Sequence, residues 1–411
     1  MKKLISLVMV LAMCVFLLAG CGQSEEPAAS DSPSEAPSEV SAEPAGDETD
    51  AEGASFMIGG VGPLTGDNAI YGTAVMNGVQ IAVDEINAAG GINGYQIEYR
   101  FEDDVSDGES SVNAYNTLMD WGMQLLVGPV TTGPAISVSA EVYNDRVFAL
   151  TPSASSPDVT AGKDNMFQMC FTDPNQGVTA ADYIADNALG TAIGIIYDSS
   201  DAYSTGIYTA FETEAQARGL NIVQASSFTA DSNTDLSTQV QQCKDAGADL
   251  VFLPIYYQQA SVVLSTAAAN DYAPVFFGCD GMDGILGIDG FDTSLANGLM
   301  LLCHFSAYGE DETTTTFVSA YEGAFGETPN QFAADAYDCV YAIYQCVTDG
   351  TITPDMSASD MCDALKTAFT SMSFSGTTGE NQTWSADGTI SKEPKVYQVQ
   401  DGSYVLVSSE E

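Results

Sequence analysis

Basic side chains are scarce in this sequence. Of its 411 residues only 10 are Lys or Arg, against 57 Asp or Glu, which gives a formal net charge of −47. A protein that follows the phosphates of a nucleic acid needs clustered Lys and Arg. The composition therefore excludes a nucleic acid as a partner.

Histidine is almost absent as well, since His304 is the only one. One imidazole cannot supply both a Ser-His-Asp triad and a His metal site, nor a zinc motif with several His ligands. The Asp-Gly pairs between residues 280 and 290 miss the spacing of a calcium loop, and the cysteines include no Cys-x-x-Cys. We therefore expect no metal, no other cofactor and no catalytic residues.

Charged residues make up 16 % of the chain, whereas 45 % of its residues are hydrophobic and 9 % are aromatic. Ordinary soluble domains contain roughly 25 % charged residues. The chain has enough apolar side chains for a large core, so we do not expect disorder throughout.

An apolar run over residues 4–18 follows Lys2 and Lys3. It is too short to span a bilayer and predicts an export signal over residues 1–20. The run ends in Leu-Ala-Gly-Cys at positions 18–21, which resembles the lipobox of bacterial lipoproteins. This resemblance implies that Cys21 carries a lipid, which would hold the chain on the outer face of the cell membrane. The alternative is an ordinary signal peptide with an incidental cysteine.

Residues 22–54 contain ten acidic residues, six Ser and four Pro, and no aromatic residue. Such a segment cannot bury enough apolar surface to fold. We expect residues 21–54 to form a disordered, acidic tether.

The rest of the chain, residues 55–411, is too long for one ordinary core and repeats a pattern of strand, loop and helix. The first series of expected strands covers residues 56–58, 97–102, 125–127 and 147–150. The second series covers 192–197, 222–228, 250–253 and 275–277, with helices near 204–218, 236–246 and 261–270. This alternation predicts an α/β fold with two Rossmann-like lobes, each with a parallel sheet, and a ligand at the carboxyl ends of the strands.

Polar side chains gather in the loops that follow these strands. The first series supplies hydroxyl groups that suit a carboxylate together with helix-end amides, at Thr132, Ser153 and Ser155. The second series supplies a carboxylate that suits an ammonium, at Asp280, with the phenols of Tyr203 and Tyr256. Together these loops favour a site for a small zwitterion, although each hydroxyl residue taken alone also suits a helix cap or a turn.

A nucleotide site is disfavoured in the first of these loops. Gly60-Val61-Gly62 begins like the G-x-G-x-x-G fingerprint, but Thr65 stands at the third glycine position and Pro63 lacks an amide hydrogen. No Lys or Arg stands in the loops to balance a phosphate.

Several segments also resemble a known family. They are Gly-Pro-Leu-Thr-Gly at 62–66, Asp-Glu-Ile-Asn-Ala-Ala-Gly-Gly-Ile-Asn-Gly at 84–94, Asp-Asp at 103–104, Thr-Pro-Ser-Ala-Ser-Ser-Pro at 151–157 and Gly-Cys-Asp-Gly at 278–281. In this order they resemble extracellular solute-binding proteins of the leucine-isoleucine-valine-binding type, which have the type I periplasmic-binding fold. The resemblance covers nearly all of residues 55–400.

The resemblance implies roles for eight residues. Thr132 and Ser155 resemble the family's hydroxyl ligands of the α-carboxylate, Ser153 its backbone contributor, Asp280 the acid that faces the α-ammonium, and Tyr203 and Tyr256 the tyrosines of the second lobe; Tyr71 and Phe332 would border the ligand side chain. Residues 256–258, Tyr-Tyr-Gln, replace a glycine-rich loop of the family. The selectivity for the ligand side chain is therefore left open.

The family also implies two hinged lobes joined by three crossovers, expected near Asp173, His304 and Lys392. The expected lobes are residues 55–173 with 305–392 and residues 174–304 with 393–411. The implied function is that of a monomeric, lipid-anchored subunit that delivers a small amino acid, branched-chain or otherwise apolar, to the permease of an ABC importer. The alternatives are a binding or sensor protein for an amide, an aromatic acid or a short peptide, and a surface enzyme.

Overall fold

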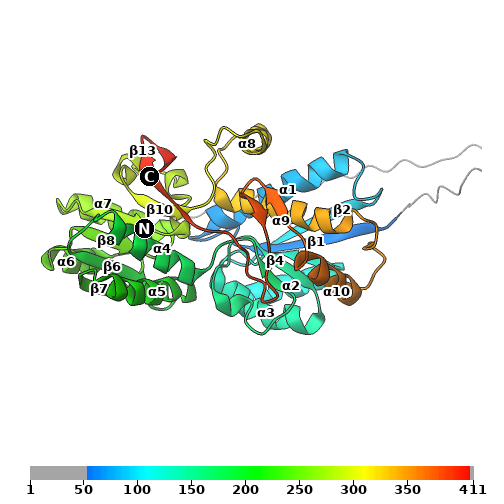
Figure 1. Cartoon of the computed structure of the whole chain (residues 1–411), viewed down its shortest axis with the longest axis horizontal. Helices are drawn as coiled ribbons and strands as arrows, with labels where there is room; N and C mark the ends of the chain where they lie inside the picture. Colours follow the sequence, from blue (N-terminus) through cyan, green and yellow to red (C-terminus); the bar gives the residue numbers. More distant parts are fainter. Residues whose placement is uncertain (1–52, 408–411) are drawn as a thin grey trace, which may run out of the picture. The chain divides into compact units, whose positions relative to one another are not determined.

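Two β-sheets with helices around them form the framework of the protein (Figure 1). The computed structural model describes residues 53–407, which lie within one compact unit, Ala51–Glu411. The expected export signal, Cys21 with its expected lipid, and all but the last two residues of the expected tether lie outside the described residues. None of the helices within residues 53–407 combines the length and the apolarity that crossing a bilayer requires.

The first sheet has the strand order β2-β1-β3-β4-β5, and all of its neighbouring strands are parallel. Its strands are β1 (Ser55–Gly62), β2 (Gln96–Asp103), β3 (Leu125–Val127), β4 (Phe148–Thr151) and β5 (Met166–Gln168). The helices on this side are α1 (Ala69–Ala88), α2 (Gly108–Trp121), α3 (Thr132–Asp145), α8 (Glu312–Phe325), α9 (Gln331–Val347) and α10 (Ala358–Phe369). Helices α1 and α9, which are far apart in the sequence, lie side by side (Figure 1).

The second sheet has the strand order β14-β13-β10-β9-β8-β6-β7. Its strands are β6 (Ile193–Asp198), β7 (Ile222–Phe228), β8 (Leu250–Leu253), β9 (Val275–Gly278), β10 (Met300–Cys303), β13 (Lys395–Gln400) and β14 (Ser403–Leu406). The helices packed on this side are α4 (Asp173–Asp186), α5 (Ala202–Arg218), α6 (Ser237–Asp245) and α7 (Tyr257–Ala269), together with the 3₁₀ turn η3 (Asp280–Met282). Strands β11 (Phe374–Gly376) and β12 (Gly379–Gln382) form a separate hairpin.

The sequence pattern predicted the bounds of three strands, β3, β7 and β8, without error. Helix α7 differs from the prediction, because it begins at Tyr257, four residues before its expected start. Strands such as β3 and β8 are entirely buried because helices cover both faces of a parallel sheet, which is why they are visible as apolar runs. The limits of the two lobes stay a prediction.

The second sheet is not parallel throughout, which differs from the expectation. Strand β13 is antiparallel to β10, and β14 is antiparallel to β13. The link between β13 and β14 consists of Asp401 and Gly402 alone, with φ angles of 50° and 79°. A two-residue turn with positive φ at both positions joins antiparallel strands only.

The seven cysteines between residues 170 and 362 are all buried and free: Cys170, Cys243, Cys279, Cys303, Cys339, Cys346 and Cys362. Burial raises the pKa of each thiol, for example that of Cys243 to about 11. A thiol that stays protonated at neutral pH is a poor nucleophile, so these side chains act as small apolar groups in the core.

A buried ion pair lies where two of the three crossovers were expected. The ammonium of Lys392 donates to Asp335 Oδ1 and to the Thr378 hydroxyl, both at 2.7 Å. The ring of His304 contacts the same Asp335 oxygen through Nε2 at 2.8 Å, and burial lowers the pKa of this imidazole. Asp335 is 1 % exposed and Lys392 is 5 % exposed, so each charge depends on the other for compensation.

We expect Asp335→Asn to lower the free energy of unfolding by about 3 to 5 kcal/mol, because it removes the carboxylate to which the buried Lys392 ammonium is hydrogen-bonded. The matched control is Asp164→Asn. Asp164 pairs with Arg146 and Lys366 but its side chain is 51 % exposed, so its loss should cost about 1 kcal/mol or less. Urea unfolding followed by circular dichroism measures both. Equal losses in the two variants would contradict this account of the buried pair.

Candidate functional site

One small cavity collects most of the residues that the sequence singled out. Seven of the eight expected ligand residues line it: Tyr71, Thr132, Ser153, Tyr203, Tyr256, Asp280 and Phe332. Val130, Thr131 and Gly281 complete the lining, and the cavity volume is about 20 Å³. These residues come from elements of both sheets, as expected for a site at the carboxyl ends of parallel strands. Their contact with a ligand stays a prediction.

Ser155 is the expected ligand residue that does not line the cavity. It is fully buried, and its carbonyl accepts the N–H of Asp173 at 3.0 Å, which ties it to the start of α4. The Ser155 hydroxyl lies beside the carboxylate of Asp173 and acts to lower its pKa. Burial has the larger, opposite effect and raises the pKa of Asp173 well above its usual range, which favours the neutral carboxyl.

The N-terminus of α3 faces the cavity through Thr131 and Thr132. The N–H of Ala135 is bonded to the carbonyl of Thr131, so the N–H groups of Thr132 and Gly133 precede the first helical hydrogen bond. Free N–H groups at the positive end of a helix dipole attract an anion. A carboxylate bound at this side of the cavity could therefore accept hydrogen bonds from the N–H groups at the start of α3 and from the Thr132 hydroxyl.

The Ser153 hydroxyl has a structural partner. It donates to the carbonyl of Val130 at 2.7 Å, so its proton is not available to a ligand anion. The neighbouring Thr151 hydroxyl donates in the same way to the carbonyl of Pro129 at 2.7 Å. The two bonds fix the loop between β3 and α3, which positions the α3 N-terminus.

On the opposite wall, Asp280 is 4 % exposed and held at three points. Its Oδ1 accepts the Tyr203 hydroxyl at 2.7 Å, its N–H donates to Gln176 Oε1 at 3.0 Å, and its carbonyl accepts from Gln331 Nε2 at 3.1 Å. Burial raises the pKa of Asp280 to about 6, although the bond from Tyr203 works in the opposite direction. The ten residues that line the cavity include no Lys or Arg. At neutral pH the site therefore presents a negative charge that a ligand cation can balance.

Gly281 allows the tyrosines to pack against the backbone. A Cβ atom at this position would lie 2.7 Å from the Tyr203 hydroxyl and 3.0 Å from Cδ1 of Tyr256. The rings of Tyr203 and Tyr256 stack at 4.8 Å with an interplanar angle of 11°. A side chain at residue 281 would displace this stack, so glycine is required here for a close approach.

Tyr71 joins the two walls of the cavity. Its hydroxyl, on α1, donates to the carbonyl of Gly281 at 2.5 Å and accepts the N–H of Tyr257 at 3.2 Å. Its ring packs against Phe332 at 4.6 Å. The remaining 20 Å³ is about the space of a single water molecule. A ligand as large as an amino acid is admitted only after these aromatic side chains move or the two walls separate.

Sequence reasoning missed the two glutamines that hold Asp280. Gln176 lies on α4 and Gln331 is the first residue of α9, and both are buried. Gln331 also donates its backbone N–H to Asp283 Oδ2 at 2.8 Å. These contacts form between segments that are 48 to 104 residues apart, and no local pattern marks them. Within residues 53–407, no group of three or more His, Cys, Asp or Glu side chains is arranged to hold a metal ion.

Two β-sheets, each packed against helices, have loops that converge on one small cavity, which is the architecture of a two-lobed binding protein. The family model described as "Periplasmic binding protein" matches residues 55–403, and the chain belongs to this family. The expected family and fold class are confirmed.

The curated relatives match this chain over part of its length. The Leu/Ile/Val-binding protein homolog 3 of Brucella melitensis is 35 % identical over 211 residues, which is 51 % of this chain and 57 % of that protein. The Leu/Ile/Val-binding protein BraC3 of Rhizobium johnstonii is 35 % identical over 221 residues, or 53 % of this chain and 60 % of that protein. The chain thus spans about three fifths of the length of these relatives.

Solved structures agree over a longer range. The branched-chain amino acid transporter substrate binding protein LivJ from Streptococcus pneumoniae, in complex with isoleucine, has a TM-score of 0.78 and 26 % identity, and the match covers 86 % of this chain and all of that chain. A solute binding protein from R. palustris in complex with benzoate has a TM-score of 0.75 at 18 % identity, covering 87 % of this chain and 98 % of that chain. The second likeness shows the fold alone.

The raised pKa of Asp280 predicts an unusual pH dependence of stability. A carboxyl with a pKa of about 6 in the folded chain and about 3.9 in the unfolded chain binds its proton more tightly when folded. Its stabilising contribution is present below pH 4 and is lost as the pH rises through 6. Asp280→Asn removes the charge and keeps an acceptor for Tyr203, so we expect it to stabilise the ligand-free protein by about 1 to 3 kcal/mol at pH 7.5 and by less at pH 4.5.

Urea unfolding at the two pH values measures this difference. Asp289→Asn, at an exposed carboxylate nine residues further along, is the matched control and should change little at either pH. A gain of the same size at both pH values, or a loss at pH 7.5, would show that burial does not penalise the Asp280 charge.

Proposed function

We propose that this chain is a substrate-binding protein that encloses a small apolar amino acid between two closing lobes. The observation that supports the proposal is that one cavity is lined both by groups that bind an anion and by a carboxylate that binds a cation. The α3 N-terminus and Thr132 suit the α-carboxylate, and Asp280 opposite them suits the α-ammonium. A zwitterion satisfies both walls at once.

The aromatic side chains that line the cavity determine which kind of ligand side chain it accepts. Tyr71 and Phe332 pack together beside the cavity, and the Tyr203–Tyr256 stack forms another apolar wall. An apolar side chain that displaced or reordered these rings would gain hydrophobic contact without leaving a polar group unpaired. The names of the relatives and the isoleucine complex of the Streptococcus pneumoniae protein support a branched-chain ligand.

Closure of the two lobes completes the proposed mechanism. The loop 280–283 binds the ligand through Asp280 and contacts α1 and α9 through Gly281 and Asp283. A ligand that neutralises Asp280 favours the closed arrangement, because the contacts of this loop form together. The crossovers near Asp173, His304 and Lys392 would absorb the movement as hinges.

The wider role follows from the family. We propose that the chain delivers its ligand to the permease of an ABC importer without transforming it chemically, and that it acts as a monomer. We further propose that it works on the outer face of the cell membrane, held by a lipid on Cys21. The support for this anchor is the lipobox-like sequence at positions 18–21.

The test is calorimetric titration of the full chain at pH 7.5 with each of the twenty amino acids and with benzoate. We expect leucine, isoleucine or valine to bind and benzoate to bind at least tenfold more weakly, since it lacks an ammonium for Asp280. Asp280→Asn should weaken the amino acid by roughly 10- to 100-fold, which is the range for a hydrogen bond to a charged group.

The folded state of the variant is checked by circular dichroism, and Asp289→Asn serves again as the control for the loss of one carboxylate. Unchanged affinity in Asp280→Asn would exclude the ammonium contact. Binding of benzoate in preference to every amino acid would replace the proposed ligand class with aromatic acids.

A further inference from the structure

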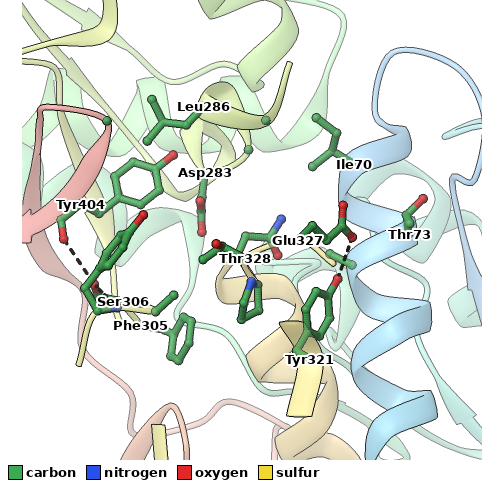
Figure 2. Close-up of a pocket in the computed structure, with 18 of the residues that line it drawn as sticks. Ile70, Thr73, Asp283, Leu286, Phe305, Ser306, Tyr321, Glu327, Thr328 and Tyr404 are labelled. Carbon is green, nitrogen blue, oxygen red and sulfur yellow. Dashed lines mark hydrogen bonds between the residues drawn. The ribbon is translucent and has the colours of Figure 1, made fainter. Parts of the chain in front are cut away.

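A second cavity, of about 480 Å³, lies next to the candidate site and shares none of its lining residues (Figure 2). Its walls come from five parts of the chain: the start of α1, the loop 283–287, the segment 305–308, the end of α8 with the loop into α9, and the β13–β14 hairpin. Small-molecule sites have volumes of about 300 to 1,000 Å³. This cavity is therefore large enough for an organic ligand.

Asp283 provides a buried negative charge in this cavity. It is 2 % exposed, and its Oδ2 accepts the N–H of Gln331 at 2.8 Å. Burial raises its pKa to about 6, so the carboxylate is ionised at neutral pH. Tyr404 points toward Asp283 (Figure 2), and its hydroxyl lies close enough to the carboxylate to lower the pKa of Asp283. A buried carboxylate and a phenol oxygen at one place can both accept hydrogen bonds from a ligand.

The wall beside α1 carries a second acid. The exposed carboxylate of Glu327 accepts the hydroxyl of Tyr321 at 3.3 Å (Figure 2). The 19 residues that line the cavity include no Lys, Arg or His. Between the polar groups lie apolar and aromatic side chains such as Ile70, Leu286 and Phe305. The cavity is thus acidic at two points and apolar in between.

We propose that this cavity binds a small organic cation, a primary amine with an apolar body, whose ammonium is held by Asp283 and attracted at longer range by the exposed charge of Glu327. An ammonium donates to carboxylates and to a phenol oxygen, and it is attracted by the faces of aromatic rings. An anion would meet two carboxylates with no cation to offset them. The site goes beyond the amino-acid site of the proposed function and does not depend on it.

The position of the cavity gives the amine an effect on closure. Its walls include α1 and the loop into α9, on the side of the first sheet, and the loop 283–287 and the hairpin residue Tyr404, on the side of the second sheet. A molecule that contacts both sides binds the closed arrangement better than an open one. We expect the amine to strengthen amino-acid binding by the same factor by which the amino acid strengthens binding of the amine.

Calorimetric titration of the full chain with benzylamine at pH 7.5, where it is a cation, tests the proposal, with benzyl alcohol as the neutral probe of similar size. We expect benzylamine to bind and benzyl alcohol to bind at least tenfold more weakly. Asp283→Asn should lower the affinity for benzylamine about tenfold or more, and Glu327→Gln should lower it several-fold because this carboxylate is exposed.

Two further variants keep the outcome unambiguous. Thr73→Trp, at a half-buried lining residue on α1, should fill the cavity and abolish benzylamine binding even if Asp283→Asn fails to fold. Asp280→Asn should still bind benzylamine, because Asp280 does not line this cavity, and this result separates the cavity from the amino-acid site. The control Glu141→Gln removes an exposed carboxylate from α3, outside both cavities, and should have no effect.

The proposal is overturned if benzylamine does not bind, or if benzyl alcohol binds equally well. It is also overturned if Glu327→Gln and Thr73→Trp both leave the affinity unchanged, or if Asp280→Asn abolishes it. A failure of the amino-acid panel leaves all of these results readable, because the benzylamine measurements need no amino acid.

Discussion

The carboxylate of Asp280 carries a negative charge in a cavity whose lining residues include no Lys or Arg. Five of the eight Lys and Arg within residues 53–407 pair with acids elsewhere: Arg100 with Glu102, Arg146 with Asp164 and Asp363, Arg218 with Asp182 and Asp186, Lys366 with Asp164 and Asp363, and Lys392 with Asp335. None of these lines the candidate cavity. The scarcity of Lys and Arg thus becomes a property of the site, because a cation there has to come from the ligand.

Recognition and closure use the same short loop. Asp280 is the residue that faces the ligand cation, Gly281 receives the Tyr71 hydroxyl, and Asp283 receives the first N–H of α9. Gln331 reinforces the connection, because its side chain bonds the carbonyl of Asp280 while its backbone bonds Asp283. A change of charge at Asp280 therefore affects the contacts between elements of the two sheets, and this couples the free energy of ligand binding to that of closure.

Much of the fold was predictable because parallel strands are buried on both faces. The apolar runs at β3 and β8 and the helices between strands follow from that burial, and the loops after the strands then mark one edge of each sheet. Strands β13 and β14 carried no such signal, since β14 lies at an edge and Leu406 is half exposed. Their antiparallel pairing depends on the turn at Asp401 and Gly402.

The site was predictable as a set of residues but not as a set of hydrogen bonds. The sequence placed Thr132, Asp280 and the tyrosines in loops that meet, and the structure brings them to one cavity. It did not indicate that the Ser153 hydroxyl donates its hydrogen bond to the carbonyl of Val130, nor that the carbonyl of Ser155 accepts the N–H of Asp173 at the start of α4. The role of Asp283 was hidden too, because its cavity is assembled from five separate segments. Contacts of this kind depend on packing between distant parts of the chain.

The most direct test of ligand recognition at Asp280 is a crystal structure of the full chain with bound isoleucine at pH 7.5. We expect the ammonium within hydrogen-bond distance of Asp280 and the carboxylate at the N-terminus of α3 beside Thr132, with the rings of Tyr71 or Tyr256 moved to admit the side chain. A ligand bound with its carboxylate toward Asp280, or bound away from this cavity, would contradict this expectation.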